Sequence, residues 1–420
     1  ENRKTVVLQS HLDMVHQKNS DTIFNFEKEG IKMLIQGDWV TADGTTLGAD
    51  NGLGVASIMA VLASTEIEHP NLEALFTIDE ETGMTGAMGL EGGVLKGEIL
   101  LNLDTEEDDE IGMGCAGGID VTAIRTYSEE LVPETATAFT ISVKGLNGGH
   151  SGMDIIKGLG NANKIMNRLL FEGATNYGLK ISEVNGGSLR NAIPRESFAL
   201  VTIDAASTEF FLLKTSELIN NIKEEFSTIE RNLRIEIQET QLPEKVMEIG
   251  VQEGFLKSIY AAFNGVYRMS PDIENLVETS NNIARVIVKS GQIKIGCLTR
   301  SSSETNKIDL ANSLKSAFEL SGFSVELSGE YPGWQPNINS EILDIVSNLY
   351  ENLHGEKAKV EACHAGLECG ILGQNYPEID MVSFGPTIRG AHSPDERASI
   401  SSTKKFWNFL IEILKNIPKK

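Results

Sequence analysis

The sequence predicts an α/β domain with a covered mixed sheet, interrupted by an inserted domain of the α+β class. Its 420 residues are too many for one ordinary domain and fit two. Short apolar runs alternate with helical stretches up to about Gly118, which is typical of a sheet covered on both faces. A similar alternation returns near the end of the chain. We therefore expect residues 1–118 and 333–420 to form one domain and residues 119–332 to be inserted into it.

The first region contains three apolar runs, at 4–9, 73–78 and 98–103, that predict strands. Between the first two runs, small and apolar residues recur at helical spacing over 52–64 and predict a helix. The strand at 4–9 has no helix before it to cover the sheet. An α/β domain rarely opens in this way, so we expect that an N-terminal segment is missing from this chain.

The middle region is richer in strands. One of its predicted helices, 310–322, ends in Gly322 as a C-cap would. The order strand, helix, strand, strand occurs twice, which suggests an internal duplication. The other elements predicted here are strands at 138–145, 195–204, 232–237, 284–290 and 293–299 and a helix at 161–173, followed in the last region by a helix at 340–355, a strand at 380–386 and a helix at 402–417.

Composition excludes several classes of protein. The 60 acidic residues against 36 basic ones give a formal charge of −24, whereas a nucleic-acid-binding protein needs a basic footprint. The four cysteines include no CxxC pair, which argues against a disulfide framework and a structural zinc knuckle. No apolar run is long enough to span a bilayer and no leader is recognisable. We expect a soluble cytoplasmic protein that binds neither nucleic acid nor membrane.

A G-x-G-x-x-G pattern at 112–117 formally matches a dinucleotide-binding loop. That loop requires a strand immediately before it and a helix after it. An acidic stretch precedes the pattern and no clear helix follows. We therefore do not assign a dinucleotide site to this segment.

Polar residues that suit a metal site follow the predicted strands. His11 and Asp13 end the first strand, and residues two apart on a strand face the same side. The Asp13 carboxylate could therefore orient the imidazole of His11. Glu80 and Glu81 follow the second strand and Asp104 follows the third. Ligands of such sheets gather at the carboxyl ends of the strands, where a cation would offset the repulsion between neighbouring carboxylates.

Two further candidates lie outside the strands. Asp50 stands just before the helix at 52–64, where a helix N-cap is the simple alternative. His392 lies in a polar loop ahead of the closing helix. Together with the strand-end residues they include two histidines and at least three carboxylates. This inventory suits two zinc-like ions bridged by one carboxylate.

The motifs that carry these residues resemble those of the dinuclear zinc exopeptidase family that includes aminoacylases and carboxypeptidase G. More narrowly, the chain is similar to the aminoacyl-histidine dipeptidase branch, also called peptidase D or Xaa-His dipeptidase. The match covers nearly the whole chain, and members normally carry an additional N-terminal segment. The resemblance implies a zinc-binding α/β domain with an inserted lid. The motifs are HLDMV (11–15), GADNGLG (48–54), DEETGMTGA (79–87), NLDTEE (102–107), NGGHSGMDI (147–155), HAGLECG (364–370) and GAHSPDE (390–396).

The resemblance also implies a role for each candidate. Asp50 bridges two divalent ions, and Glu80 is the general base. Asp13 orients His11. The substrate is held by three lid residues and one glycine. By resemblance, His11 and Asp104 complete one metal site, Glu81 and His392 complete the other, and His150, Asn191, Arg300 and Gly366 bind substrate.

The predicted activity is a metallo-dipeptidase acting on Xaa-His and related small peptides, carnosine-like compounds included. The expected cofactors are two divalent ions, zinc first, with cobalt or manganese as alternatives. The lid could also mediate a homodimer. An N-acyl-amino-acid deacylase and a catalytically inactive metal-binding homologue are the alternatives. The size of the inserted domain argues against the first, and the presence of Glu80 argues against the second.

Overall fold

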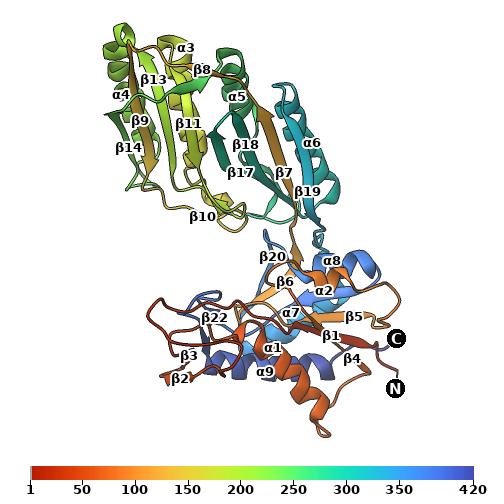
Figure 1. Cartoon of the computed structure of the whole chain (residues 1–420). Coiled ribbons are helices and arrows are strands. Elements are labelled where there is room, and N and C mark those ends of the chain that lie inside the picture. Colours follow the sequence, from red (N-terminus) through yellow and green to blue (C-terminus); the bar gives the residue numbers. More distant parts are fainter. Residues whose placement is uncertain (1) are drawn as a thin grey trace. The chain divides into compact units, whose positions relative to one another are not determined.

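The computed structural model describes residues 2–420, which form two compact units. Unit 1 comprises the described residues up to Cys115 together with Pro332–Lys420, and unit 2 comprises Ala116–Tyr331. In Figure 1 the two ends of the chain, coloured red to orange and blue, therefore build unit 1, and the middle of the chain builds unit 2. Among the described residues, no helix is long and apolar enough to cross a membrane.

Unit 1 is built on a six-stranded sheet in the order β20-β6-β21-β5-β1-β4. Every residue of β1 is buried, as expected for a strand covered on both faces. β1 runs parallel to its neighbours β4 and β5, whereas β21 is antiparallel to β6. The predicted mixed sheet is confirmed. The strands are β1 (Val6–His11), β4 (Leu72–Thr77), β5 (Ile99–Asn102), β6 (Glu110–Cys115), β20 (Lys359–Cys363) and β21 (Asp380–Ser383).

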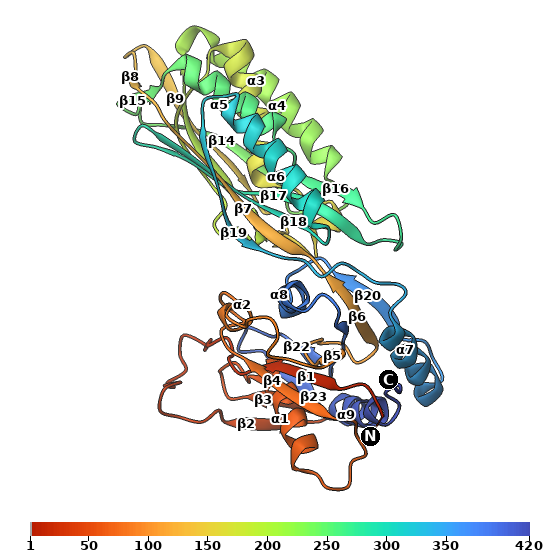
Figure 2. The same cartoon turned by 90° about the vertical axis from the view of Figure 1, so that its right-hand side faces the viewer.

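Helices cover both faces of this sheet. Figures 1 and 2 show α1 and α9 on one face and α2 and α8 on the other. Helix α7 packs against α9. The predicted helices at 340–355 and 402–417 correspond to α7 and α9. The helices are α1 (Ala49–Ala63), α2 (Thr85–Met88), α7 (Glu341–His354), α8 (Glu368–Asn375) and α9 (Ile400–Lys415).

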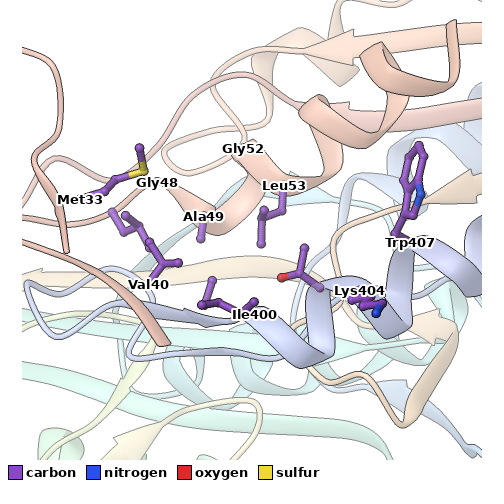
Figure 3. Close-up of a pocket in the computed structure, with 12 residues that line it drawn as sticks. Met33, Val40, Gly48, Ala49, Gly52, Leu53, Ile400, Lys404 and Trp407 are labelled. Carbon is purple, nitrogen blue, oxygen red and sulfur yellow. The ribbon is translucent and has the colours of Figure 1, made fainter. Parts of the chain in front are cut away.

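A smaller sheet in unit 1 has the order β2-β3-β23-β22. Together with α1 and α9 it lines a hollow of about 680 Å³ with mainly apolar walls, including Val40, Leu53 and Trp407 (Figure 3). None of the predicted metal ligands, all of which are described residues, lines this hollow. The strands are β2 (Met33–Gln36), β3 (Trp39–Ala42), β22 (Ile388–Arg389) and β23 (Arg397–Ser399).

Unit 2 is built on a nine-stranded sheet in the order β14-β9-β13-β11-β17-β18-β7-β19, with β16 paired to β17. Its helices α3, α4, α5 and α6 lie on one face of the sheet (Figure 2), where buried apolar side chains such as Phe211, Phe255 and Phe318 form the core. The strands are β7 (Gly117–Thr126), β9 (Ala136–Lys144), β11 (Lys180–Gly186), β13 (Ser197–Asp204), β14 (Arg234–Thr240), β16 (Gly265–Met269), β17 (Val277–Lys289), β18 (Gln292–Ser301) and β19 (Ser324–Tyr331), and the helices are α3 (Ala162–Tyr177), α4 (Thr208–Glu225), α5 (Ile249–Ala261) and α6 (Glu304–Glu319).

Four short strands complete the description. β8 (Glu129–Leu131) pairs with β15 (Lys245–Met247), and β10 (Gly149–His150) pairs with β12 (Ala192–Ile193). Apart from short strands, unit 2 contains the order helix, strand, strand, helix, strand twice, as α3-β11-β13-α4-β14 and α5-β17-β18-α6-β19. The two sets occupy mirrored positions that meet at β11 and β17. This arrangement supports the internal duplication suggested by the sequence.

Two local expectations can be compared with the structure. Helix α6 ends at Glu319, and Gly322 adopts the left-handed conformation, φ +77°, just after it. The N–H of Gly322 donates to the carbonyl of Glu319 at 2.9 Å and that of Phe323 to the carbonyl of Phe318 at 3.2 Å, so Gly322 terminates the helix as expected. The segment 112–117 runs from β6 into β7, and no helix follows it. It therefore lacks the helix that a dinucleotide-binding loop needs.

Candidate metal centre

His11 is the last residue of β1 and is fully buried. Its Nε2 lies 3.2 Å from Oδ1 of Asp50 and 3.4 Å from Oδ1 of Asp104. Its Nδ1 donates to the backbone carbonyl of Asp13 at 3.0 Å. Because that hydrogen bond occupies Nδ1, Nε2 is the nitrogen that faces the carboxylates and could bind a cation.

His392 makes a second cluster with the other oxygen of Asp50. Its Nε2 lies 3.2 Å from Oδ2 of Asp50 and 2.9 Å from Oε2 of Glu81. The described residues thus contain two triads of possible ligands that share Asp50, His11–Asp50–Asp104 and Asp50–Glu81–His392, beside a third group, His11–Glu80–Glu81. Asp50 belongs to both and presents a different oxygen to each histidine, as a bridging carboxylate would.

The chemistry and spacing of these atoms fit two divalent cations. A tetrahedral ion bound at about 2.0 Å holds its ligand atoms about 3.3 Å apart, and the histidine–carboxylate distances here are 2.9–3.4 Å. Oε1 of Glu81 is buried and has no hydrogen-bond partner among the described residues. An unsatisfied buried carboxylate oxygen is costly, and a cation would satisfy it.

The backbone around Asp50 explains how its side chain enters the site. Helix α1 begins after Gly48, which has φ +74° and is the N-cap. Asp50 and Asn51 depart from helical angles within the first turn. The N-cap alternative for Asp50 is therefore wrong, because its carboxylate faces the two histidines. Asn51 donates its side-chain amide to Asp104, which fixes a ligand of the first triad.

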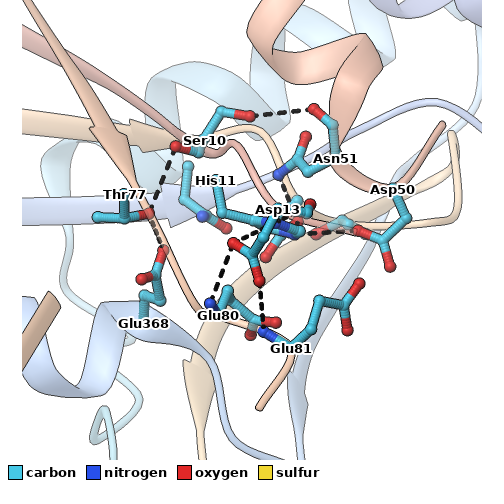
Figure 4. A network of polar contacts seen from close by, with 12 residues as sticks. Ser10, His11, Asp13, Asp50, Asn51, Thr77, Glu80, Glu81 and Glu368 are labelled. Carbon is cyan, nitrogen blue, oxygen red and sulfur yellow. Dashed lines mark hydrogen bonds and ion pairs between the residues drawn. The ribbon is translucent and has the colours of Figure 1, made fainter. Parts of the chain in front are cut away.

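Asp13 holds the turn that carries Glu80 and Glu81. Its Oδ1 accepts from the backbone N–H of Glu80 and its Oδ2 from that of Glu81, both at 3.1 Å (Figure 4). The carboxylate also lies 3.5 Å from Nδ1 of His11. Asp13 can thus position both the histidine, as expected, and the Glu80–Glu81 turn, which sequence reasoning missed.

The carboxylates and histidines perturb one another strongly. Burial opposes the charge of His11, but hydrogen bonds and charges from Asp104 and Asp50 outweigh it and raise the pKa of His11 to about 12. Hydrogen bonds that the protonated ring donates to Asp50 and Glu81 raise the pKa of His392 to about 10. Burial and the charge of Asp104 raise the pKa of Glu80 to about 8. Protons therefore occupy atoms that a cation would use, so the two compete.

A buried polar network supports the strand ends beneath this site. Oε2 of Glu368 accepts from Nε2 of Gln9 at 2.6 Å and from Oγ1 of Thr77 at 2.5 Å. Gln9 in turn accepts from the side-chain amide of Asn102. Gln9 and Asn102 each precede a candidate ligand by two residues, so the network fixes the strands that carry His11 and Asp104. Glu368, which sequence reasoning missed, lies inside the HAGLECG motif.

In unit 2, the tautomer of His150 follows from its backbone contacts. Nδ1 accepts from the N–H groups of Gly152 and Met153 at 3.2 and 3.1 Å, so the proton of the neutral ring is on Nε2. Burial and the charge of Arg300 lower the pKa of His150 to about 4. His150 therefore presents a neutral Nε2–H donor at physiological pH.

Arg300 is a buried cation beside this donor, with 4% of its surface exposed. Its Nη1 donates to the Tyr331 hydroxyl at 2.7 Å, and its Nη2 lies 3.5 Å from Nε2 of His150. Within the described residues, its Nε has no hydrogen-bond partner and no carboxylate forms an ion pair with it. Two donors that face one another without an acceptor, one of them cationic, suit an anionic or carbonyl ligand.

The structure places every predicted site residue. The five metal candidates, Glu80 and Asp13 come together in unit 1, where Gly366 also lies between β20 and α8. In unit 2, the exposed Asn191 accepts from the N–H of Ser151 at 2.7 Å through its backbone carbonyl and thus adjoins the loop of His150. The individual roles of these residues in binding and catalysis stay predictions.

Comparisons with known proteins agree with the geometry of the site. The model of "Peptidase family M20/M25/M40" matches residues 7–416. The cytosol non-specific dipeptidase of Escherichia coli (strain K12) is 44% identical over 420 residues, which cover 100% of this chain and 87% of that protein. The structure of aminoacylhistidine dipeptidase from Vibrio alginolyticus matches with a TM-score of 0.93 and 45% identity, over 100% of this chain and 86% of that one.

A more distant structure shares the fold. The aminopeptidase PepT from Bacillus cereus matches with a TM-score of 0.54 and 16% identity, over 99% of this chain and 81% of that one. The family resemblance predicted from the motifs is confirmed by the match over nearly the whole chain. The protein belongs to peptidase family M20/M25/M40.

Proposed function

We propose that this protein is a metal-dependent dipeptidase that hydrolyses Xaa-His and related dipeptides, carnosine-like compounds included. The observation that carries the proposal is the position of Asp50, whose Oδ1 faces His11 and whose Oδ2 faces His392. A carboxylate shared in this way suits a pair of cations. The names of the relatives from E. coli and V. alginolyticus, at 44% and 45% identity, support the dipeptide substrate class.

The proposed cofactors are two zinc ions. His11 and Asp104 would hold one, Glu81 and His392 the other, and Asp50 would contribute to both. Imidazole and carboxylate donors suit zinc, with cobalt and manganese as alternatives. When bound, such ions polarise a carbonyl and lower the pKa of a water ligand to about 7. Elemental analysis of the purified protein tests the identity and number of the ions.

Glu80 is the proposed general base. It would accept a proton from the attacking water and later donate a proton to the leaving amine, so that it acts first as a base and then as an acid. Burial and neighbouring carboxylates raise its pKa to about 8, which reflects a strong tendency to accept a proton. The hydrogen bond from its backbone N–H to Asp13 keeps the base in one orientation.

The proposed substrate contacts come mainly from unit 2, which would act as a lid. The Nε2–H of His150 would donate to the oxyanion that develops at the scissile carbonyl. Arg300 would grip the terminal carboxylate of the dipeptide through two N–H groups. The side-chain amide of Asn191 and the backbone at Gly366 are proposed to make further contacts with the substrate.

A direct test compares the release of histidine from Xaa-His dipeptides with the release of acetate from N-acetyl amino acids. A dipeptidase releases histidine and spares the acylated compounds. Acetate release alone would instead identify a deacylase. A protein that binds metal but releases neither product is an inactive homologue. A homodimer and a cytoplasmic location stay predictions, which light scattering and cell fractionation can test.

A further inference from the structure

Glu396 is a buried carboxylate that does not belong to either ligand triad. It is 2% exposed and lies four residues after His392 in the loop between β22 and β23. Oε2 accepts from the N–H groups of Leu47 and Gly48 at 2.7 and 3.0 Å. Oε1 accepts from those of Ala49 and Asp50 at 2.8 and 3.3 Å. One side chain thus accepts from four successive backbone donors.

These four donors form a concave anion site in the backbone. Gly48 has φ +74°, the left-handed conformation that lets consecutive N–H groups converge on one point. The same groups stand at the start of α1, where the helix dipole also favours negative charge. Glu396 occupies this site as an internal anion, and the last of its donors is the backbone of the shared ligand Asp50.

Apart from Glu396, the segment at 47–50 has mainly apolar contacts. Leu47 and Ala49 belong to a small apolar cluster with Ile388 and Ala398, and the side chain of Met14 lies where a Cβ of Gly48 would stand. Leu47, Gly48 and Ala49 also line the hollow shown in Figure 3. The carboxylate of Glu396 accepts from all four backbone N–H groups of the segment, so it supplies the polar contacts that orient them.

Glu396 also anchors the loop that carries His392. Its N–H donates to the carbonyl of Ser393 at 3.0 Å, and the N–H of Ser393 donates to that of Gly390 at 3.2 Å. His392 has φ +65° in this tight loop. A single side chain therefore ties the downstream end of the His392 loop to the segment that ends in Asp50.

We propose that Glu396 is a positioning residue that sets the ion position between Asp50, Glu81 and His392. The inference rests on the proposed dinuclear site. The other ion position depends less on Glu396, because His11 and Asp104 follow strands that are fixed by the network of Gln9 and Asn102. Loss of Glu396 should therefore weaken one ion and spare the other.

The test is a titration of ion-free protein with Zn²⁺ in competition with a chromophoric chelator. In Glu396→Gln, the amide offers one acceptor oxygen where the carboxylate offers two. We expect the dissociation constant of one step to rise about 10- to 100-fold, the usual effect of losing a residue that orients metal ligands, with the other step changed by less than about threefold. His392→Ala identifies the affected step, because that step should be lost in this variant.

The matched control is Glu73→Gln. Glu73 lies at the opposite end of β4 from the site and accepts from the N–H groups of Lys96 and Gly97 at 2.9 Å. It should leave both zinc steps unchanged. Equal weakening of both steps in Glu396→Gln, or no change in either, would overturn the proposal.

Circular dichroism and the melting temperature of the ion-free protein monitor folding. If Glu396→Gln does not fold, Glu396→Asp is titrated under the same criterion. Its side chain keeps the charge but is one methylene too short to reach all four donors. The titration contains no substrate, so it remains decisive even if the dipeptidase assay fails.

Discussion

Replacing Arg300 with glutamine should remove most of the preference of the enzyme for a free C-terminal carboxylate. The guanidinium is buried, no carboxylate of the described residues forms an ion pair with it, and its Nη1 donates to the Tyr331 hydroxyl. Asp120 acts on it only through its charge, so a substrate carboxylate would supply a direct ion-pair partner. Glutamine has a similar length but no charge, so it cannot make a charge-assisted contact with that group.

The expected magnitude follows from the contacts that are lost. Each hydrogen bond between charged groups contributes about 1.5–3 kcal/mol, so two such bonds contribute at least about 3 kcal/mol. At 1.36 kcal/mol for each factor of ten, this corresponds to about 150-fold in kcat/KM. The variant also loses the hydrogen bond to Tyr331, but that loss affects all substrates equally and cancels in a ratio.

The assay measures kcat/KM for a dipeptide and for its C-terminal amide, with wild-type protein and with Arg300→Gln. We expect the ratio of the two values to fall by about 150-fold in the variant. Arg168→Gln is the matched control, since Arg168 lies in the same unit and pairs with Glu225 at 2.6 Å. Its substrate ratio should equal that of the wild type. Arg300 does not bind the carboxylate if Arg300→Gln lowers kcat/KM equally for both compounds.

Three further predictions concern the metal centre. Glu80→Gln should keep the metal content of the wild type and lower kcat by about 10²- to 10⁴-fold; elemental analysis with steady-state kinetics checks this, and an unchanged kcat would exclude Glu80 as the base. Zinc affinity should rise with pH between 6 and 8. The pKa values of His11, about 12, and His392, about 10, lie above the ordinary 6.5, so both rings lose protons when zinc binds. Calorimetry in buffers of different ionisation enthalpy should detect this proton release, and proton uptake would contradict the prediction. Asp13→Asn should lower kcat/KM about 10- to 100-fold, since asparagine offers one oxygen to two N–H groups; an unchanged kcat/KM would show that Asp13 does not position the turn.

Four strands of the six-stranded sheet, β1, β4, β5 and β21, could be predicted because each coincides with a short apolar run, whereas β6 and β20 of the same sheet were missed. β1 is buried along its whole length, and its sequence gives a direct signal. Helix α4 was missed because apolar residues lie on several of its sides, with Phe211 buried and Phe210 and Leu213 exposed. Such a segment lacks the clear helical period on which sequence reasoning depends. β7 was missed for a related reason, since polar residues such as Asp120 interrupt its apolar run.

The candidate ligands could be predicted because they are chemically distinctive and lie in recognisable motifs. Glu368 and Glu396 were missed although both lie inside quoted motifs. Glu396 contacts backbone N–H groups about 350 positions earlier in the chain, and these groups have no sequence signature. Glu368 contacts Thr77 and Gln9, which come from two different strands. Only the folded arrangement brings these partners together, so no spacing rule could identify them.

The two ion positions are supported in different ways, and this difference has a functional consequence. His11 ends β1 and Asp104 follows β5, two strands whose residues are all buried, whereas His392 stands in a loop and its side chain is 54% exposed. Loops open at lower free energy than core strands, so the His392 ligand is the one that local motion can remove. Asp50 belongs to both triads, so motion of the His392 loop can reach the ion beside His11 only through the Asp50 carboxylate. The carboxylate of Glu396 opposes this motion, but the loop still opens more readily than the strands. The ion beside His392 should therefore exchange faster than the ion beside His11 even in the wild-type protein.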